Sequence, residues 1–407
     1  MNCHGNLFRL MAVVALALLL SAGTWMAVAA APVAQAAFSC ANVSEIPQSE
    51  CQALVALYNS TNGPHWTRQA GWLTTNTPCS WEGVTCDAGH VSRLELSGNN
   101  LNGPVLFELA DLTRLERLYL NNNLLSGTIP TVLGRLTNLQ ELGLDQNQLT
   151  GAIPSELVGL VQLRVLGLSF NQLSGPIPPE LGNLTNLQQI FLYTNQLSGP
   201  IPPELSRLVN LQGIYLQENQ LSGAIPPELG NLAKLKTLIL ADNQLSGSIP
   251  PELGKLANLE GLILAGNKLS GAIPPELGKL AKLQGFWLFD NQLSGTIPPE
   301  LGSLPALLAL DVSNNELSGV IPPELGQRTD LEELSFAHNH LSGTIPPELG
   351  NLVNLIRLEL ASNQLSGPIP PQLANLVLLG PGRLKLGYNA FTAFDPTLLA
   401  FLAKNEP

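Results

Sequence analysis

A glutamate recurs every 24 residues through much of the chain, and such a row of carboxylates could hold metal ions or perform acid–base chemistry. Each of these glutamates follows two prolines and precedes a leucine. Proline suits the first position of a short helix, glutamate its first turn and the glycine that usually follows its end. We therefore interpret the row as repeated helix starts on the outer side of a coil. Its members are Glu180, Glu204, Glu228, Glu252, Glu276, Glu300, Glu324 and Glu348.

Ser335, His338 and Asp311 are the residue types of a hydrolytic triad. In that chemistry, histidine takes the serine proton and an oxyanion hole stabilises the intermediate. No oxyanion-hole motif accompanies these residues, and serine is so frequent in the chain that the combination is an easy coincidence. The sequence also lacks a phosphate-binding loop and a dinucleotide fingerprint. We predict a protein that is not an enzyme and that uses no cofactor and no metal.

Residues 1–36 have the pattern of a secretory signal peptide. Arg9 precedes the apolar run 10–22, and Ala34 and Ala36 form a small-residue cleavage pattern. An uncleaved anchor is the alternative, although the run is short for a membrane span. We expect cleavage after Ala36 and a secreted, extracellular or cell-surface protein with no membrane span in the mature chain.

Four cysteines remain after this cleavage, all in the first fifth of the chain: Cys40, Cys51, Cys79 and Cys86. An even number in an exported chain implies disulfide bonds. Three pairings are open, and the short segment between Cys79 and Cys86 favours Cys79–Cys86 together with Cys40–Cys51. A zinc site is the alternative, but the sequence has no CxxC pair or nearby histidine pair to support it.

The formal net charge of −12 argues against nucleic acid as a partner, because phosphate binding requires a basic face.

Residues 91–390 form a repeat array, in which asparagine returns every 24 residues from Asn99 to Asn363 and again at Asn389, two residues late. The surrounding pattern, LxxLxLxxNxLSGxIPxxLGxL, is that of the leucine-rich repeat. About 13 such repeats stack, because one repeat alone cannot bury its leucine face.

The ends of the array need caps, and both are visible. Residues 37–90 lack the repeat and form a disulfide-bonded N-terminal cap, with a helix over 49–59 that begins at a capping box of Ser49 and Gln52. The tryptophans in this segment are expected to fill the cap core. Residues 391–407 form the C-terminal cap, in which 396–404 is expected to be a short covering helix.

The element LSGxIP marks plant-type leucine-rich repeats. The chain resembles the ectodomains of plant receptor-like kinases and the polygalacturonase-inhibiting proteins, and CSWEGVTCD (79–87) looks like the end of their N-terminal cap. The stretch ALVALYNSTNGPHW (53–66) is also similar to caps of exported bacterial and protist repeat proteins. The resemblance implies an α/β solenoid: a curved, right-handed superhelix with a parallel concave β-sheet, a second strand in each repeat, and ligands on the inner face.

The strand phase assigns side chains to this inner face. With the repeated asparagine at position nine, positions four and six point into the core, and positions three, five, seven and eight face the concave side. In 285–291, Phe286 and Leu288 are then core, whereas Trp287 and Phe289 face outward. The candidate ligand-binding residues are Phe170, Phe191, Tyr193, Tyr215, Glu218, Ile239, Asp242, Ile263, Trp287, Phe289 and Asp290.

Two interpretations of this patch are open. Large side chains in adjacent strands cover one another, and strand propensity alone favours aromatic residues and isoleucine. An exposed apolar band rimmed by charge, however, usually marks an interaction surface, and aromatic residues supply most of the anchoring in interfaces. We favour a binding module for a protein or peptide, with a glycan as another ligand class. An inhibitor of a secreted hydrolase and an adhesive or structural surface protein are the alternative functions.

Overall fold

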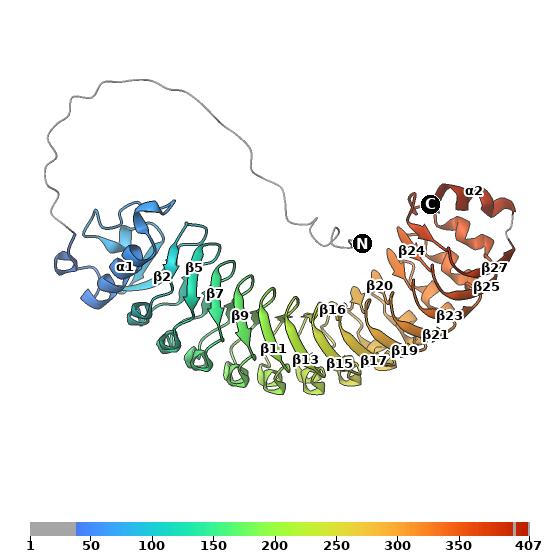
Figure 1. Cartoon of the computed structure of the whole chain (residues 1–407), viewed down its shortest axis with the longest axis horizontal. Helices are drawn as coiled ribbons and strands as arrows, with labels where there is room; N and C mark the ends of the chain where they lie inside the picture. Colours follow the sequence, from blue (N-terminus) through green and yellow to red (C-terminus); the bar gives the residue numbers. More distant parts are fainter. Residues whose placement is uncertain (1–37, 394–395, 406–407) are drawn as a thin grey trace, which may run out of the picture. The chain divides into compact units, whose positions relative to one another are not determined.

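The computed structural model describes residues 38–393 and 396–405. The signal segment expected at 1–36 lies outside this part of the chain. Among the described residues, no helix is both long and apolar enough to span a bilayer. Phe38–Pro407 forms one compact unit, and its described part is a curved solenoid that runs from the cap around α1 to the cap around α2 (Figure 1).

A 14-stranded sheet lines the inner side of the arc (Figure 1). Its first pair, β1 (Val84–Asp87) and β2 (His90–Glu95), is antiparallel, and every later pair is parallel. The later strands are β4 (Arg117–Tyr119), β6 (Glu141–Gly143), β8 (Val165–Gly167), β10 (Gln189–Phe191), β12 (Gly213–Tyr215), β14 (Thr237–Ile239), β16 (Gly261–Ile263), β18 (Gly285–Trp287), β20 (Ala309–Asp311), β22 (Glu333–Ser335), β24 (Arg357–Glu359) and β26 (Leu384–Lys385).

A second sheet of 13 strands runs along the side of the arc, as the LSGxIP element predicts. Each strand spans the Leu-Ser-Gly segment of one repeat or its equivalent. The strands are β3 (Asn102–Pro104), β5 (Leu124–Thr128), β7 (Gln148–Gly151), β9 (Gln172–Gly175), β11 (Gln196–Gly199), β13 (Gln220–Gly223), β15 (Gln244–Gly247), β17 (Lys268–Gly271), β19 (Gln292–Gly295), β21 (Glu316–Gly319), β23 (His340–Gly343), β25 (Gln364–Pro368) and β27 (Ala390–Ala393).

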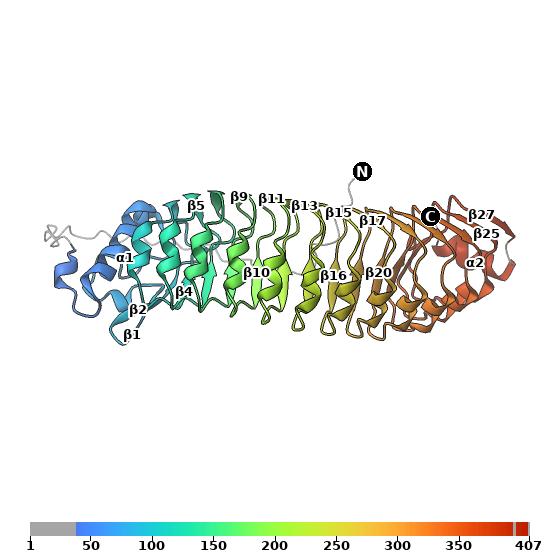
Figure 2. The same cartoon turned by 90° about the horizontal axis from the view of Figure 1, so that it is seen from below.

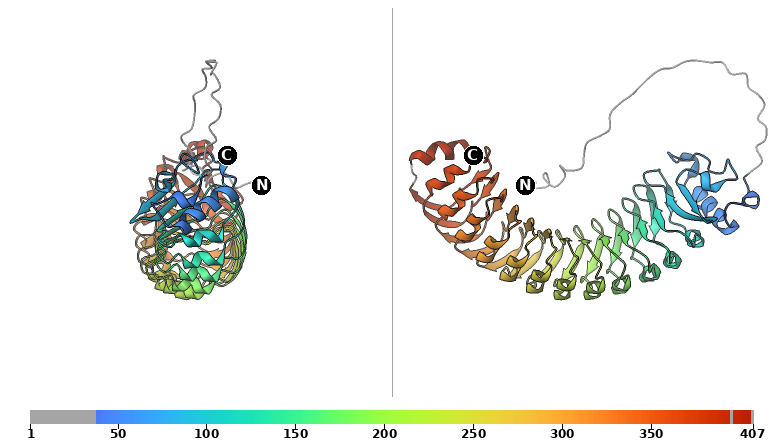
Figure 3. Two further views of the ribbon diagram at one scale, coloured as in Figure 1. Left: turned by 90° about the vertical axis from the view of Figure 1, so that its left-hand side faces the viewer. Right: turned by 180° about the vertical axis from the view of Figure 1, so that it is seen from behind.

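Short 3₁₀ turns form the outer side, which faces the viewer in Figure 2 and lies along the lower rim of the arc in the right-hand view of Figure 3. Most begin with proline and carry the repeated glutamate in the first turn, as the sequence predicts. They comprise Phe107–Asp111, Thr131–Arg135, Ser155–Gly159, Pro179–Asn183, Pro203–Arg207, Pro227–Asn231, Pro251–Lys255, Pro275–Lys279, Pro299–Ser303, Pro323–Gln327, Pro347–Asn351 and Pro371–Asn375.

The glycine of the outer turn has a different role from the one expected. Gly254 lies inside its 3₁₀ turn rather than after it. A Cβ atom at Gly254 would stand 2.4 Å from the carbonyl oxygen of Glu276 in the next repeat. Such a separation is far inside van der Waals contact, so glycine is required because neighbouring turns pack backbone against backbone.

The leucine positions and the asparagine ladder form the interior. Leu238 and Leu240 are fully buried, as the period-two pattern predicts. The Asn243 amide donates to the carbonyl oxygens of Leu216 and Leu240 at 3.0 and 3.1 Å, and its oxygen accepts the Leu221 N–H at 3.0 Å. The same pattern recurs along the array, so buried backbone groups that no strand pairs are satisfied by one side chain per repeat.

The N-terminal cap confirms both predicted disulfide bonds, Cys40–Cys51 and Cys79–Cys86. The predicted capping box is wrong, because α1 (Gln48–Ser60) begins one residue before Ser49, directly after Pro47. Proline fixes the extended conformation from which this helix starts, and no side chain caps it. Three further 3₁₀ turns complete the cap: Cys40–Asn42, Gly63–His65 and Pro78–Ser80.

Tryptophans fill the interior of this cap, as expected. Trp66, Trp72 and Trp81 are all buried, and successive pairs of their rings lie 4.9 Å apart. Glu50 of α1 is also buried; it contacts Nδ1 of His90 at 2.6 Å and accepts the Val91 N–H at 2.8 Å. The cap is therefore joined to the first strand of the array by charge-assisted hydrogen bonds.

At the other end, the expected covering helix is present as α2 (Pro396–Asn405), which packs against the last 3₁₀ turn, Pro371–Asn375. Leu398 and Leu402 of α2 are buried. The helix thus covers leucines that the last repeat would otherwise expose.

Replacing Asn243 by leucine tests the ladder. The variant removes the side-chain acceptor of the Leu221 N–H. It also removes one of the two amide donors to each of the Leu216 and Leu240 carbonyls, which keep those of Asn219 and Asn267. We therefore expect a loss of about 1–3 kcal/mol in the free energy of unfolding. Gln244→Leu, at the exposed neighbouring position, should change it by at most about 0.5 kcal/mol. Urea denaturation of both variants measures the difference, and equal losses would contradict a special role of the asparagine.

Candidate binding face

Five side chains at position five form a continuous row across β10, β12, β14, β16 and β18. The strand register places Phe191 beside Tyr215, then Ile239, Ile263 and Trp287. All five are partly exposed on the inner side. Neighbouring parallel strands lie about 4.8 Å apart, so the row spans roughly 19 Å. We call it the apolar row.

Four aromatic rings of this face form two separate pairs rather than one stack. Phe191 and Tyr215 stack with ring centroids 4.7 Å apart, whereas Phe170 and Tyr193 meet edge to face at 5.1 Å. Ile239 and Ile263 follow the stacked pair in the row. Neighbouring side chains therefore cover part of each paired ring, as one of the two interpretations predicts. The rest of each ring stays exposed, so an apolar surface remains.

Glycines at position three allow two of the rings to lie against the sheet. A Cβ atom at Gly285 would meet the Trp287 ring at 2.0 Å, and one at Gly213 would meet the Tyr215 ring at 2.5 Å. Each ring therefore occupies the space that another residue's side chain would fill. Phe289, two residues beyond Trp287, is also partly exposed.

Glu218, Asp242 and Asp290 are exposed along one edge of the row, where the sequence predicted a charged rim. All three have left-handed backbone conformations, with φ of 56°, 53° and 55°. Position eight is left-handed in most repeats because the chain turns there before the ladder asparagine, and polar residues such as aspartate tolerate this conformation. The turn thus fixes the place of these carboxylates.

Not every residue at the predicted positions is exposed. Ser335 and Glu359 at position five and Ser169 at position seven are buried, contrary to the expectation that these positions face solvent. The side chains do lie on the inner side of the strands, but neighbours in adjacent repeats cover them. Residues 24 apart in the sequence are neighbours on adjacent strands. The exposure of a side chain on this face therefore depends on these neighbours, which the pattern of a single repeat does not reveal.

The clearest case is a charged cluster at the C-terminal end of the sheet. Glu359 accepts from Arg357 Nε at 3.0 Å and from Lys385 Nζ at 2.7 Å, and Arg357 also lies 3.7 Å from Glu333. Burial by itself raises the pKa of Glu359, but the hydrogen bonds and positive charges of Arg357 and Lys385 outweigh it and lower the pKa below its ordinary value.

Asp311, Ser335 and His338 do not form a triad. Asp311 accepts hydrogen bonds from the N–H and hydroxyl of Ser313 at 2.9 and 2.5 Å. The Ser335 hydroxyl is buried without a hydrogen-bond partner in the described chain, and His338 lies in the exposed left-handed turn. Burial raises the pKa of Asp311, and the hydrogen bonds from Ser313 offset only part of this effect.

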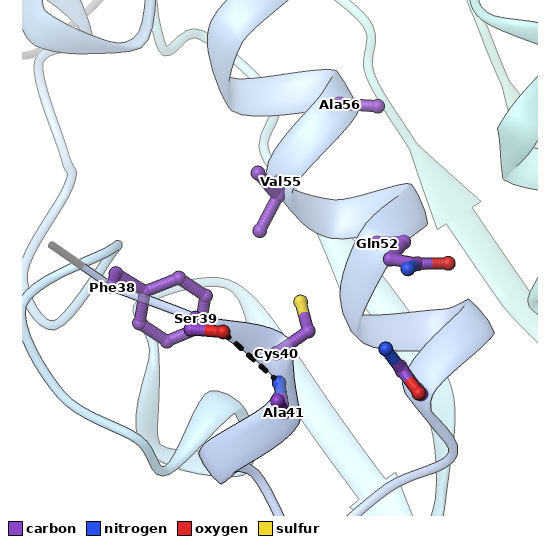
Figure 4. Close-up of a pocket in the computed structure, with 8 residues that line it drawn as sticks. Phe38, Ser39, Cys40, Ala41, Gln52, Val55 and Ala56 are labelled. Carbon is purple, nitrogen blue, oxygen red and sulfur yellow. Dashed lines mark hydrogen bonds between the residues drawn. The ribbon is translucent and has the colours of Figure 1, made fainter.

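Two shallow hollows lie at the N-terminal end. One, of about 370 Å³, is in the cap, where Phe38 and Cys40 face Val55 and Ala56 of α1 (Figure 4). The other, of about 500 Å³, lies on the inner side between Arg68, Thr85, Glu95 and Tyr119. Neither includes the apolar row, which is an open face. Among the described residues, no three histidine, cysteine, aspartate or glutamate side chains are placed to hold a metal ion.

Comparison with known proteins agrees with this architecture. A model of the leucine rich repeat N-terminal domain matches residues 47–87, and a leucine rich repeat model matches 113–173. A second leucine rich repeat model matches 186–208, 210–232, 234–256, 258–280, 282–304, 306–327, 330–352 and 354–376.

Similar solved structures come from plants and bacteria. The crystal structure of PEPR1–AtPEP1 has 36% identity and a TM-score of 0.79 over 85% of this chain. The Arabidopsis receptor kinase HAESA, in complex with the peptide hormone IDA and the co-receptor SERK1, has 30% identity and a TM-score of 0.65 over 84% of this chain. A leucine-rich repeat protein of Leptospira interrogans, LIC12759, has 33% identity and a TM-score of 0.59 over 72%.

This chain spans only part of those proteins: 49% of the PEPR1 chain, 66% of the HAESA chain and 78% of the Leptospira chain. The leucine-rich repeat architecture is thus shared with plant receptor ectodomains and with a bacterial protein alike.

Glu359→Gln should destabilise the protein at neutral pH and have a smaller effect in acid. The folded-state pKa of Glu359 is lowered, so its stabilising contribution is complete above the unfolded pKa and is lost as the pH falls through the folded pKa. We expect a loss of about 1–3 kcal/mol near pH 7, since the side chain is mostly buried, and a smaller loss near pH 3. Urea denaturation at both values measures this, and an equal loss at both contradicts it.

Asp311→Asn should change the free energy of unfolding in the opposite direction from Glu359→Gln. Burial raises the pKa of Asp311, so its ionised form opposes folding above the folded-state pKa, and this penalty is relieved as the pH falls. The asparagine oxygen can still accept from Ser313. We therefore expect the variant to be as stable as the parent or more stable near pH 7, with the advantage lost in acid. Marked destabilisation at neutral pH, measured in the same urea titrations, would overturn this explanation.

Proposed function

The chain belongs to the leucine-rich repeat family, whose repeat models together match more than half of it, and we propose that its inner face binds a protein or peptide ligand. The observation that carries this proposal is the apolar row, with five partly exposed side chains in register across five strands. A surface of this kind, flanked by exposed carboxylates, is typical of interaction sites.

The shape of the row favours an extended segment as the ligand. A span of roughly 19 Å corresponds to about six residues of extended chain at about 3.3 Å per residue. Ile239 and Ile263 in its middle are aliphatic, which suits apolar side chains better than stacked sugar rings. Structural relatives support this choice, since HAESA is seen with a peptide hormone and a co-receptor.

We also propose that the protein acts outside the cell. Its two disulfide bonds are of a kind that forms and persists in oxidising compartments. Inhibition of a secreted hydrolase and adhesion are the other functions that we proposed from the sequence. A screen of the protein against extracellular proteins, peptides and glycans separates the three: a bound peptide supports the leading proposal, and loss of hydrolase activity supports the inhibitor.

Tyr215→Ala and Trp287→Ala should each weaken binding of the selected ligand about tenfold or more, because anchoring aromatic residues carry a large share of interface energy. Val209→Ala, at an exposed position beside the outer turn Pro203–Arg207, is the matched control and should leave the affinity unchanged. Isothermal titration calorimetry measures all three variants. Unchanged binding after Phe191, Tyr215, Trp287 and Phe289 are all replaced by serine would place the site elsewhere.

A further inference from the structure

A second feature of the inner face lies next to the apolar row, on the two strands where position five is glycine. Gly143 and Gly167 occupy position five on β6 and β8, between Tyr119 and Phe191. The Asp145 carboxylate fills the space above Gly167: a Cβ atom there would meet Oδ2 at 2.2 Å. Asp145 thus lies on the sheet, partly exposed, in a place that only a glycine neighbour leaves open.

This carboxylate has no cation. Oδ1 of Asp145 accepts the Ser169 N–H at 2.7 Å, but within the described chain Asp145 forms no ion pair. Burial raises the pKa of Asp145, and the hydrogen bonds from Ser169 offset only part of this rise. Glu141, by contrast, is already occupied by Tyr119 and by Arg117 Nε at 3.3 Å. A negative charge placed on a protein surface without compensation favours a positively charged ligand.

Ser169 provides an independent sign that the site is incomplete. It is fully buried, and its hydroxyl has no hydrogen-bond partner in the described chain. The hydroxyl lies near enough to the Asp145 carboxylate and the Tyr193 phenol to lower the pKa of each, although it has good hydrogen-bond geometry with neither. Buried polar groups usually have well-formed hydrogen bonds, so a hydroxyl that lacks one, beside a carboxylate without an ion pair, points to a further polar group that binds here.

Aromatic rings border the site on both sides. The Tyr119 ring leans over Gly143, where a Cβ atom would meet its Cδ1 at 2.9 Å. On the other side stand Tyr193 and its edge-on partner Phe170, and the charge of Asp145 adds to burial in raising the pKa of Tyr193. A cation held by a carboxylate between aromatic rings gains attraction from their faces as well.

We propose that Asp145, with Ser169 and Tyr193, binds an ammonium group of the peptide ligand, which is a lysine side chain or an N-terminal amine. This inference rests on the proposed peptide function. One oxygen of Asp145 already accepts a backbone N–H, so the site suits a compact point charge better than the two-pronged guanidinium of arginine. The Asp145 carboxylate lies over Gly167, and Phe191 is paired with Gly167 on the adjacent strand, so the ammonium binds about one strand spacing, roughly 5 Å, from the Phe191 end of the stacked pair.

A randomised library of twelve-residue peptides, selected against the full chain, tests the proposal. The parent should select peptides with apolar residues and a lysine, or a free N-terminal amine, about two residues away. Asp145→Asn should reduce that enrichment about tenfold, as expected for loss of a charge-assisted hydrogen bond worth about 1.4 kcal/mol or more, and keep the apolar preference. Glu156→Gln, an exposed carboxylate on the outer turn of the same repeat, should leave both preferences unchanged.

Gly167→Ala gives a second, independent test, because the added methyl group displaces the Asp145 carboxylate without removing its charge. It should abolish the ammonium preference while circular dichroism shows an intact fold. Selection of apolar peptides without this preference, or its persistence in Asp145→Asn, overturns the ammonium site and leaves the proposed function standing. Failure of the parent to select any peptide overturns both.

Discussion

The asparagine ladder is the constraint on which the rest of the molecule depends. One amide, such as that of Asn243, joins backbone groups of two successive repeats at a point where no strand can pair them. These bonds are satisfied only if the next repeat has the same length and the same turn, which keeps all parallel strands in register. Equivalent side chains therefore lie side by side, and a row on the inner face is a consequence of backbone hydrogen bonding.

Within that register, the inner face is shaped by complementary neighbours. Gly285 leaves room for the Trp287 ring, and Gly167 leaves room for the Asp145 carboxylate. Glu359 is buried and stays ionised because Arg357 and Lys385 cover it from its own strand and the next. Packing in this layer is between side chains of adjacent repeats, so each residue's exposure and pKa depend on what stands 24 residues before and after it.

This dependence explains what the sequence could and could not predict. The repeat pattern and local chemistry were enough for the solenoid, the concave sheet, the outer turns and the buried tryptophans, whereas the second sheet was implied by the resemblance to plant-type repeats. The predicted disulfide pairing is confirmed as well. The start of α1 was missed because Pro47, not Ser49, decides it, and the role of Gly254 required the position of Glu276. Asp145 gave no sequence signal, because its significance comes from Gly167 in the next strand.

The amino-acid sequence can therefore differ between repeats to different degrees on the outer and inner sides of the solenoid. On the outer side, backbones such as those of Gly254 and Glu276 pack so closely that a single added carbon cannot fit, and the same residues recur in repeat after repeat. On the inner side, side chains face solvent and substitution meets no such limit, except where a ring or a carboxylate lies against the sheet. Differences between repeats that survive this constraint are concentrated on the concave sheet. That sheet is consequently where a nearly uniform array can recognise one ligand, and the irregular residues from Asp145 to Trp287 are the part of it that carries chemical information.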